Sequence, residues 1–293
     1  MSIGIALSGG GAKGAAHIGV LQALKEEKIN VDYISGASSG SIVAALYASG
    51  YSPLNILSMF NTYCKQIADC DKTIPFKVLS TMFTGKITLK GLVNGDNLES
   101  IIYSYAKAKN IININQVKMP LAIPTVDLNT GEIIYFLNKY VPEYIPKRSV
   151  YDDTPRYIYS ATLSKIVRAS SSFPGVFEPK NMEGKLLIDG GVRINTPVSI
   201  LHKMGADKVI AVSFDKNKIG KTSSTNIISV AMKAFDIMGH QVNEPELNKA
   251  DFIIRPSMDN VSLLDCSKTN KLATQGYESA KASMSSIKEI LGI

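Results

Sequence analysis

The pentapeptide at residues 36–40, Gly-Ala-Ser-Ser-Gly, is the first segment whose residue types could do chemistry. It matches G-x-S-x-G and lies between an apolar run and a small, apolar stretch with helical spacing. This setting is typical of a nucleophile elbow, in which a serine occupies a strained turn and flanking glycines, here Gly36 and Gly40, let the neighbouring chain pass. The dipole of the following helix would stabilise negative charge there. A serine cap on that helix, from Ser38 or Ser39, is the alternative interpretation.

A second motif follows the first apolar run and satisfies G-x-G-x-x-G; its residues are Gly9, Gly10, Gly11, Ala12, Lys13 and Gly14. In a dinucleotide-binding fold this loop would hold a pyrophosphate, and an acidic residue would end the second strand. Asp32 instead lies near the start of that strand, and a Walker A loop would need Ser or Thr after its lysine. Backbone N–H groups of Gly10 and Gly11 could alternatively form an oxyanion hole. A plain tight turn is the third interpretation.

Asp189 ends the apolar run at 185–189 and is followed by Gly190 and Gly191. Asp-Gly turns are common in loops. A carboxylate at a strand end can also reach the carboxyl edge of a neighbouring strand, where ligands bind in open α/β sheets. The glycine loop, the serine turn and this aspartate would then share one rim of the sheet.

Histidine offers little as a general base in this chain. His202 and His240 lie in expected helices, and His17, just after the glycine loop, is expected to be packed or helix-capping. A carboxylate would therefore take the serine proton, which requires that burial or hydrogen bonding raise its pKa toward neutrality. The three cysteines, Cys64, Cys70 and Cys266, have neither disulfide nor metal-ligand spacing and indicate a reducing compartment. We expect no metal and no organic cofactor.

The pattern of apolar residues predicts an α/β fold. The first 50 residues alternate strand and helix, which indicates a parallel sheet with right-handed crossovers. Residues 1–293 are expected to form a single domain of three α/β/α layers around a mainly parallel sheet, with 52–118 as a lid or substrate-side insertion. Strands are expected at 3–7, 31–36, 119–128, 132–138, 185–191 and 207–214, and helices at 15–28, 39–50, 160–172 and 197–205.

Four segments, in this order, resemble the patatin-like phospholipase family in its bacterial form. They are LSGGGAKGAAHIGVLQAL (7–24), GASSGS (36–41), ASSSFPGVFEP (169–179) and IDGGVRINTPV (188–198). Together they extend over nearly two-thirds of the chain, and the combination of GGGAKG, GASSG and DGG is far more specific than any one motif. Plant members often have Asp where Ser8 stands and Arg where Lys13 stands, which we take as ordinary bacterial variation.

The resemblance implies a Ser/Asp dyad without histidine. Ser38 would be the nucleophile, Asp189 its base, and the Gly9–Gly14 loop the oxyanion hole. The implied activity is hydrolysis of lipid acyl esters, of phospholipase A or lysophospholipase type. An acyltransferase or thioesterase would use the same dyad. A nucleotide-binding module that uses the glycine loop is the alternative from another class, and a catalytically silent interaction protein fits least.

The basic balance, a formal net charge of +7, suits both solubility and approach to anionic lipid. We expect a phospholipid or other acyl-ester lipid as substrate, no nucleic-acid partner, and a cytoplasmic location that includes peripheral contact with the inner face of the membrane. The sequence does not define the oligomeric state.

Apolar residues alternate with lysines within 52–118, which indicates either an interfacial surface or ordinary core and surface. They are Met59, Phe60, Ile74, Phe76, Met82, Phe83 and Ile87, with Lys65, Lys72, Lys77, Lys86 and Lys90.

Overall fold

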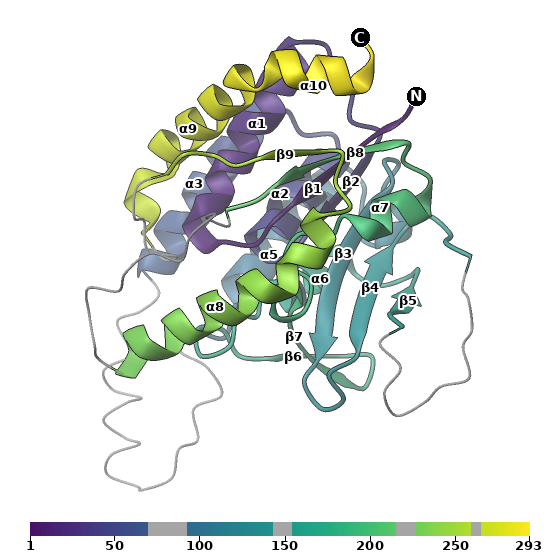
Figure 1. Ribbon diagram of the computed structural model, residues 1–293. Coiled ribbons are helices and arrows are strands. Elements are labelled where there is room, and N and C mark those ends of the chain that lie inside the picture. The colour runs from purple at the N-terminus through teal and green to yellow at the C-terminus, as the bar shows by residue number, and fades with distance from the viewer. Residues whose placement is uncertain (70–92, 143–153, 215–226, 259–264) are drawn as a thin grey trace, which may run out of the picture.

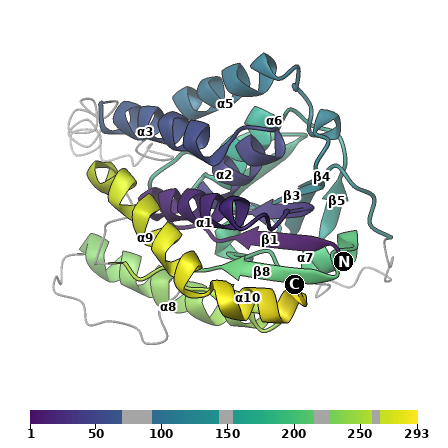
Figure 2. The same cartoon turned by 90° about the horizontal axis from the view of Figure 1, so that it is seen from above.

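The computed structural model describes residues 1–69, 93–142, 154–214, 227–258 and 265–293. Within these ranges one mixed sheet forms the middle layer, and helices cover both of its faces (Figures 1 and 2). The strands are β1 (Ile3–Leu7), β2 (Tyr33–Gly36), β3 (Leu121–Asp127), β4 (Ile133–Leu137), β5 (Arg156–Ile158), β6 (Lys180–Met182), β7 (Lys185–Asp189), β8 (Lys208–Val212) and β9 (Phe252–Ile254). This arrangement confirms the predicted three-layer α/β/α class.

The main path of the sheet has the order β5-β4-β3-β2-β1-β8-β9. The strands from β3 to β9 along this path are parallel, whereas β4 pairs antiparallel with β3. Connections that contain helices link the parallel strands, as expected for alternating strands and helices. The carboxyl ends of β1 and β2 therefore lie at one edge of the sheet, where the glycine loop and the serine turn begin.

The longer helices are α1 (Ala15–Glu26), α2 (Ser39–Ala48), α3 (Pro53–Asp69), α5 (Asp96–Ala108), α6 (Leu163–Ser170), α7 (Ser199–Met204), α8 (Ile227–Leu247), α9 (Thr269–Ala282) and α10 (Met284–Leu291). Short 3₁₀ turns occur at η1 (Gly11–Gly14), η3 (Ile114–Gln116), η4 (Gly190–Val192) and η5 (Cys266–Lys268). One face of the sheet packs against α1, α2 and α6, and the other against α7 and the end of α8.

The side chains of β1 show how strand periodicity divides the core. Ile3, Ile5 and Leu7 belong to the cluster on the α1 side, whereas Ala6 belongs to the cluster on the α7 side. Successive strand residues point to opposite faces, so large residues fill one face and small ones the other. A Cβ at Gly4 would lie 3.1 Å from Leu201 Cδ1 of α7, so small residues on this face let α7 approach the sheet closely.

The first long helix, α1, packs against α9 near the end of the chain (Figure 2). Their backbones approach closely at two glycines. A Cβ at Gly19 would lie 1.8 Å from the carbonyl oxygen of Ala273, and one at Gly276 would lie 2.0 Å from that of Ala16. Tyr277 Oη also donates a hydrogen bond of 2.6 Å to Glu26. No side chain larger than hydrogen fits at either crossing point, so α9 helps to hold α1 in place.

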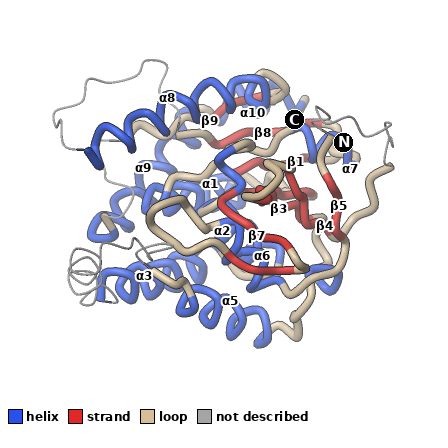
Figure 3. Tube along the Cα trace, turned by 90° about the horizontal axis from the view of Figure 1, so that it is seen from below, coloured by secondary structure: helices blue, strands red, loops and turns tan. Residues whose placement is uncertain are grey.

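One edge of β3 changes partner partway along its length. Near its start β3 pairs with β2, with Leu121 opposite Ile34, and further on it pairs with β7, with Thr125 opposite Asp189. Because β2 is parallel and β7 antiparallel to β3, the two strands run toward each other and end on either side of Pro124. Figure 3 shows β7 beside β3 and β4. Pro124, which has no N–H to donate to a ladder, stands where the partner of β3 changes.

The strands and helices predicted within residues 1–50, and those predicted at 119–138, 160–172 and 185–214, are confirmed within a few residues at each end. The short strands β5 and β6 were not predicted. The domain assignment stays a prediction, although α3 and α5 of the expected insertion pack on the core.

Most of the expected interfacial residues within 52–118 lie outside the described residues. The backbone of Lys65 is described, but its side chain is not. Phe60 is buried in the core and Met59 packs against it, which for these two favours the alternative of ordinary core.

Candidate active site

The serine turn has the backbone conformation of a nucleophile elbow. Ser38 has φ 51° and ψ −126°, a region that non-glycine residues enter only under strain. The flanking glycines permit the turn, since a Cβ at Gly40 would lie 2.4 Å from the carbonyl oxygen of Leu7, and one at Gly36 would lie 2.3 Å from that of Gly40. Strand β1 and the start of α2 therefore pass each other at backbone distance. This geometry leaves the Ser38 side chain half-buried at the strand edge.

Ser38 stands at the N-cap position of α2, but its side chain makes no capping hydrogen bond. The cap interpretation therefore does not explain this serine. Its backbone is fixed from α6 instead: Ser170 Oγ accepts the Ser38 N–H at 3.2 Å and donates to the carbonyl oxygen of Pro124 at 2.8 Å. Ser170 thus links the serine turn to Pro124 of β3, which lies between the ends of β2 and β7.

Asp189 ends β7 with its carboxyl almost completely buried; the residue is 2% exposed. Oδ1 accepts the Gly191 N–H at 2.7 Å, whereas Oδ2 is buried without a hydrogen-bond partner. Burial raises the pKa of Asp189 to about 7, against the lowering effects of the Ser38 hydroxyl and the Gly191 N–H. The Ser38 hydroxyl is therefore near enough to lower the pKa of Asp189, although no hydrogen bond of ordinary geometry joins the two side chains.

The backbone around Asp189 is held on both sides. Its N–H donates to the carbonyl oxygen of Ser172 at 3.1 Å. A Cβ at Gly190 would lie 2.3 Å from the carbonyl oxygen of Pro124, so the turn after Asp189 fits only glycine there. The carboxyl therefore sits on rigid strand structure, which preorganises it toward the elbow.

Arg168, which sequence reasoning missed, anchors the segment that receives Asp189. The residue is 2% exposed, and its guanidinium donates to Ser172 Oγ at 2.6 Å and to the carbonyl oxygens of Glu178, at 2.8 Å, and Asn94. Gly95 makes room for it, because a Cβ there would lie 1.9 Å from Arg168 Nε. A lone arginine directly after the apolar pair Ile166-Val167 and directly before the ASSSFPG segment is the signal that the sequence offers.

The glycine loop lies beside the elbow. A Cβ at Gly9 would lie 3.0 Å from Ser38 Cβ, and one at Gly10 would lie 2.5 Å from the ring of Phe214. The Gly9 N–H donates to Oδ1 and to the backbone oxygen of Asn195, at 3.0 and 3.2 Å, so it is not available to a substrate. Gly10 and Gly11 stand at the start of η1, where the first N–H groups of a helix have no intrahelical acceptor.

Of the remaining loop residues, Ala12 is buried, the Lys13 N–H donates to the carbonyl oxygen of Gly10 at 3.2 Å, and Gly14 packs against Ser39. These three contribute to the packing and hydrogen bonding of the turn, and their assignment to the oxyanion hole stays a prediction.

His17 is buried and turned away from acid–base work. Its Nε2 lies 2.7 Å from the carbonyl oxygen of Ser8, its Nδ1 has no partner, and its ring stacks on Phe214 at 4.5 Å. Burial lowers the pKa of His17 to about 4, only partly offset by the hydrogen bond to Ser8. The ring is therefore neutral at physiological pH, with Nε2–H donating to Ser8, and it supports the loop as packing, as the sequence led us to expect.

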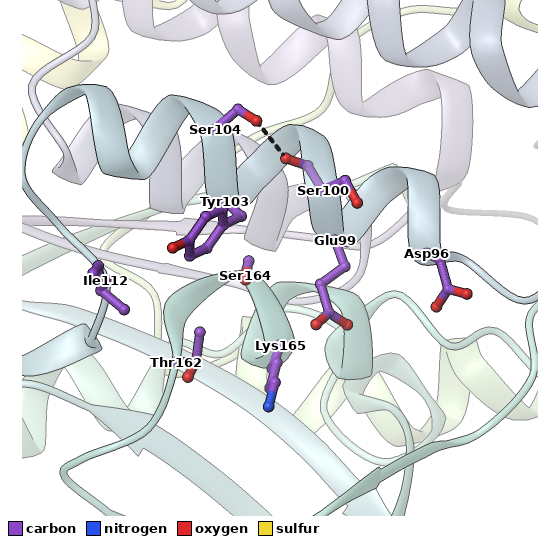
Figure 4. A pocket seen from close by; sticks show the side chains of 9 residues that line it. All are labelled: Asp96, Glu99, Ser100, Tyr103, Ser104, Ile112, Thr162, Ser164 and Lys165. Atoms are coloured by element: carbon purple, nitrogen blue, oxygen red, sulfur yellow. Dashed lines mark hydrogen bonds between the residues drawn. The ribbon is translucent and has the colours of Figure 1, made fainter.

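A cavity of about 560 Å³ lies between α5 and the first turns of α6 (Figure 4). Glu99 and Tyr103 line it from one helix, and Thr162 and Lys165 from the other side. Ser170, at the opposite end of α6, is the residue that contacts the elbow. Most of the side chains that line the cavity carry polar groups, and neither the serine nor the aspartate is among them, so we do not assign it to an acyl chain.

Two searches of the described part of the chain bear on metals and membranes. No group of three or more His, Cys, Asp or Glu side chains there could hold a metal ion. Within the same ranges no helix combines the length and apolar character that a membrane crossing needs.

The fold and the serine turn define a three-layer α/β protein with a strained serine at the end of a central strand. Residues 5–202 match the family model of patatin-like phospholipases, and the chain belongs to that family. It is 26% identical over 218 residues to an NTE family protein of Mycobacterium bovis, covering 74% of this chain and 50% of that protein. It is 28% identical over 228 residues to lysophospholipase NTE1 of Mycosarcoma maydis, and the match covers 76% of this chain and 10% of that protein.

The chain thus spans half the length or less of these two relatives. Among solved structures, VipD from Legionella pneumophila is similar with a TM-score of 0.47 and 16% identity, covering 97% of this chain and 67% of that one.

Proposed function

We propose that this chain is a serine hydrolase of lipid acyl esters, of phospholipase A or lysophospholipase type. The observation that carries the proposal is the pairing of a strained, half-buried serine with a buried carboxyl whose pKa is raised to about 7. A general base is most effective when its pKa lies near the working pH. Membership of the patatin-like phospholipase family, and a relative named lysophospholipase, support a lipid ester as substrate.

The mechanism is acyl transfer in two steps. Ser38 Oγ attacks the ester carbonyl carbon while Asp189 Oδ2, which has no other partner, accepts the hydroxyl proton. Negative charge develops on the carbonyl oxygen and is stabilised by the N–H groups of Gly10 and Gly11. The leaving alcohol takes the proton from Asp189. Water then attacks the acyl-enzyme, with the same carboxylate as its base, and releases the fatty acid.

The nucleotide-binding alternative finds no support at the strand ends. Asp32 Oδ2 accepts the N–H of Ile3 at 2.8 Å, at the opposite end of β1 from the glycine loop. It is therefore placed away from any ribose bound at that loop. Phe214 also packs against Gly10, on the loop that would have to approach a pyrophosphate.

The test is covalent labelling followed by turnover. A fluorophosphonate probe should label Ser38 alone, and p-nitrophenyl esters and lysophospholipids should be hydrolysed by the wild type but not by Ser38→Ala. Ser49→Ala is the matched control, because it removes a buried hydroxyl from the end of the same helix, where it bonds the carbonyl oxygen of Ala45. Full turnover in Ser38→Ala would remove Ser38 from the mechanism.

Acyl transfer to an alcohol or cleavage of a thioester would use the same residues. Adding glycerol or a lysophospholipid to the assay separates these activities, since a transferase makes a new ester at the expense of free fatty acid. Peripheral contact with anionic membranes is part of the proposal. It predicts vesicle binding that weakens as the salt concentration rises.

A further inference from the structure

Asn195 links the glycine loop to the segment that carries Asp189. It lies three residues beyond η4, and it is half-buried. Both its side-chain Oδ1 and its backbone oxygen accept the N–H of Gly9, at 3.0 and 3.2 Å. One residue therefore occupies the donor of Gly9 completely, and this fixes the direction in which the loop leaves β1.

The Asn195 carboxamide also fills the space between the two glycine segments. Its Oδ1 would lie 2.7 Å from a Cβ at Gly9 and 2.9 Å from a Cβ at Gly191. The same two positions lie 3.0 Å from Ser38 Cβ and 3.0 Å from Asp189 Oδ1, respectively. The carboxamide is thus next to both members of the dyad, in a place that a side chain at either glycine would take.

The orientation of the carboxamide follows from its partner. Gly9 offers a donor, so the atom facing it must be the oxygen, and the amide nitrogen must point the other way. Nδ2 makes no hydrogen bond to the described residues, and it is not among their enclosed polar atoms without a partner. The two N–H donors of Asn195 therefore remain open to whatever occupies the site.

We propose that Asn195 completes the oxyanion site: Oδ1 holds Gly9 so that the N–H groups of Gly10 and Gly11 face the substrate, and Nδ2 donates to the carbonyl oxygen of the ester. The inference rests on the hydrolase function proposed above. As Ser38 Oγ bonds to the acyl carbon, the C=O electron pair moves onto oxygen, and a neutral amide donor stabilises that charge without itself changing protonation state.

Two substitutions separate holding from donating. Asn195→Ala removes both roles, whereas Asn195→Asp keeps the size and the acceptor for Gly9 but replaces the amide donors by a charged oxygen. Asn138→Ala is the control, because Asn138 is also half-buried and also ties backbone, accepting the Leu121 N–H at 2.8 Å at the far end of β3. Melting temperatures of all three variants are measured beside the kinetics.

We expect kcat for a p-nitrophenyl ester to fall on the order of 100-fold in both Asn195 variants, with KM within threefold of the wild type. A trifluoromethyl ketone, which forms an oxyanion on Ser38, should lose affinity by the same factor as kcat/KM, whereas the matching secondary alcohol should not. The Asp variant is compared at its limiting rate at high pH, because a second carboxylate raises the pKa of Asp189.

Three results would overturn the inference. Near wild-type kcat in Asn195→Ala would refute it while the hydrolase stands. An active Asn195→Asp would refute the donor role of Nδ2. A wild type that neither hydrolyses esters nor labels at Ser38 would refute the proposed function, and the inference with it.

Discussion

Replacing Asp189 by Asn should change how stability depends on pH, as well as end catalysis. Burial raises the pKa of this carboxyl from its ordinary 3.8 to about 7. Below pH 3.8 the group is protonated in both the folded and the unfolded chain, so its ionisation does not lower the free energy of unfolding. Between 3.8 and 7 the unfolded chain ionises while the folded chain keeps its proton, so the wild type loses stability as the pH rises. Above 7 the loss is constant.

The size of this loss follows from the two pKa values. Their separation, from 3.8 to about 7, corresponds to roughly 4 kcal/mol at 1.36 kcal/mol per pH unit. The Asn amide does not titrate, and its Oδ1 can still accept the Gly191 N–H. Burying an amide nitrogen where Oδ2 now lies adds a penalty of about 1–3 kcal/mol that does not vary with pH. The stability difference between variant and wild type should therefore rise by about 4 kcal/mol from pH 4 to pH 8.

Urea unfolding followed by far-UV circular dichroism measures this difference, since the chain has no tryptophan. Any contribution from His17 cancels, because both proteins carry it. Asp127→Asn is the control: although burial opposes it, hydrogen bonds from Asn129 and Lys185 keep the pKa of Asp127 below its ordinary value. Its stabilising effect is complete above pH 3.8, so this variant should be weakened by a constant amount between pH 5 and 9. A difference for Asp189→Asn that stays constant within 1 kcal/mol over pH 4–8 would refute our account of the buried carboxyl.

Three further predictions concern activity and packing. The kcat/KM of ester hydrolysis should rise with pH and level off above about 7, as Asp189 ionises; a second limb near 6.5 that disappears in His17→Gln would mean that histidine acts as base. Activity should survive EDTA, since the dyad needs no Lewis acid and the described residues offer no ligand cluster; loss on chelation with recovery on adding calcium would contradict this. Arg168→Met should lose about 3–5 kcal/mol in urea unfolding, because it removes the guanidinium donors from the part-buried carbonyl oxygens of Asn94 and Glu178 and from the buried hydroxyl of Ser172; a loss below 1 kcal/mol would show that water replaces the guanidinium.

The sequence was informative wherever function depends on a local turn. The residues around Ser38 and Asp189 predict tight turns at strand ends, because the close backbone contacts at positions 36, 40 and 190 leave room only for glycine. The expectation that His17 is packed agrees with its burial, since a histidine in the first turn of a helix that follows a tight loop packs beneath that loop.

What the sequence could not provide was the register of distant strands. Nothing in residues 121–127 indicates that β3 pairs with β2 near its start and with β7 near its end, although Pro124 lies where the partner changes. The roles of Arg168 and Asn195 also depend on long-range contacts, because Asn94 and Gly9 lie 74 and 186 residues away from them along the chain. Short edge strands such as β6, with three residues, carry too little periodicity to be recognised.

The contact between α1 and α9 sets an order of events during synthesis. Thr269, where α9 begins, follows the end of α1 by about 240 residues. At roughly 5–20 residues per second, the ribosome completes α9 on the order of 10–50 seconds after α1 has been made. Over that interval the face of α1 around Gly19 stays uncovered, although Ser38 and Asp189 have both been synthesised. The packing of α1 should therefore be completed only after α9 has been synthesised, well after both members of the proposed dyad have been made.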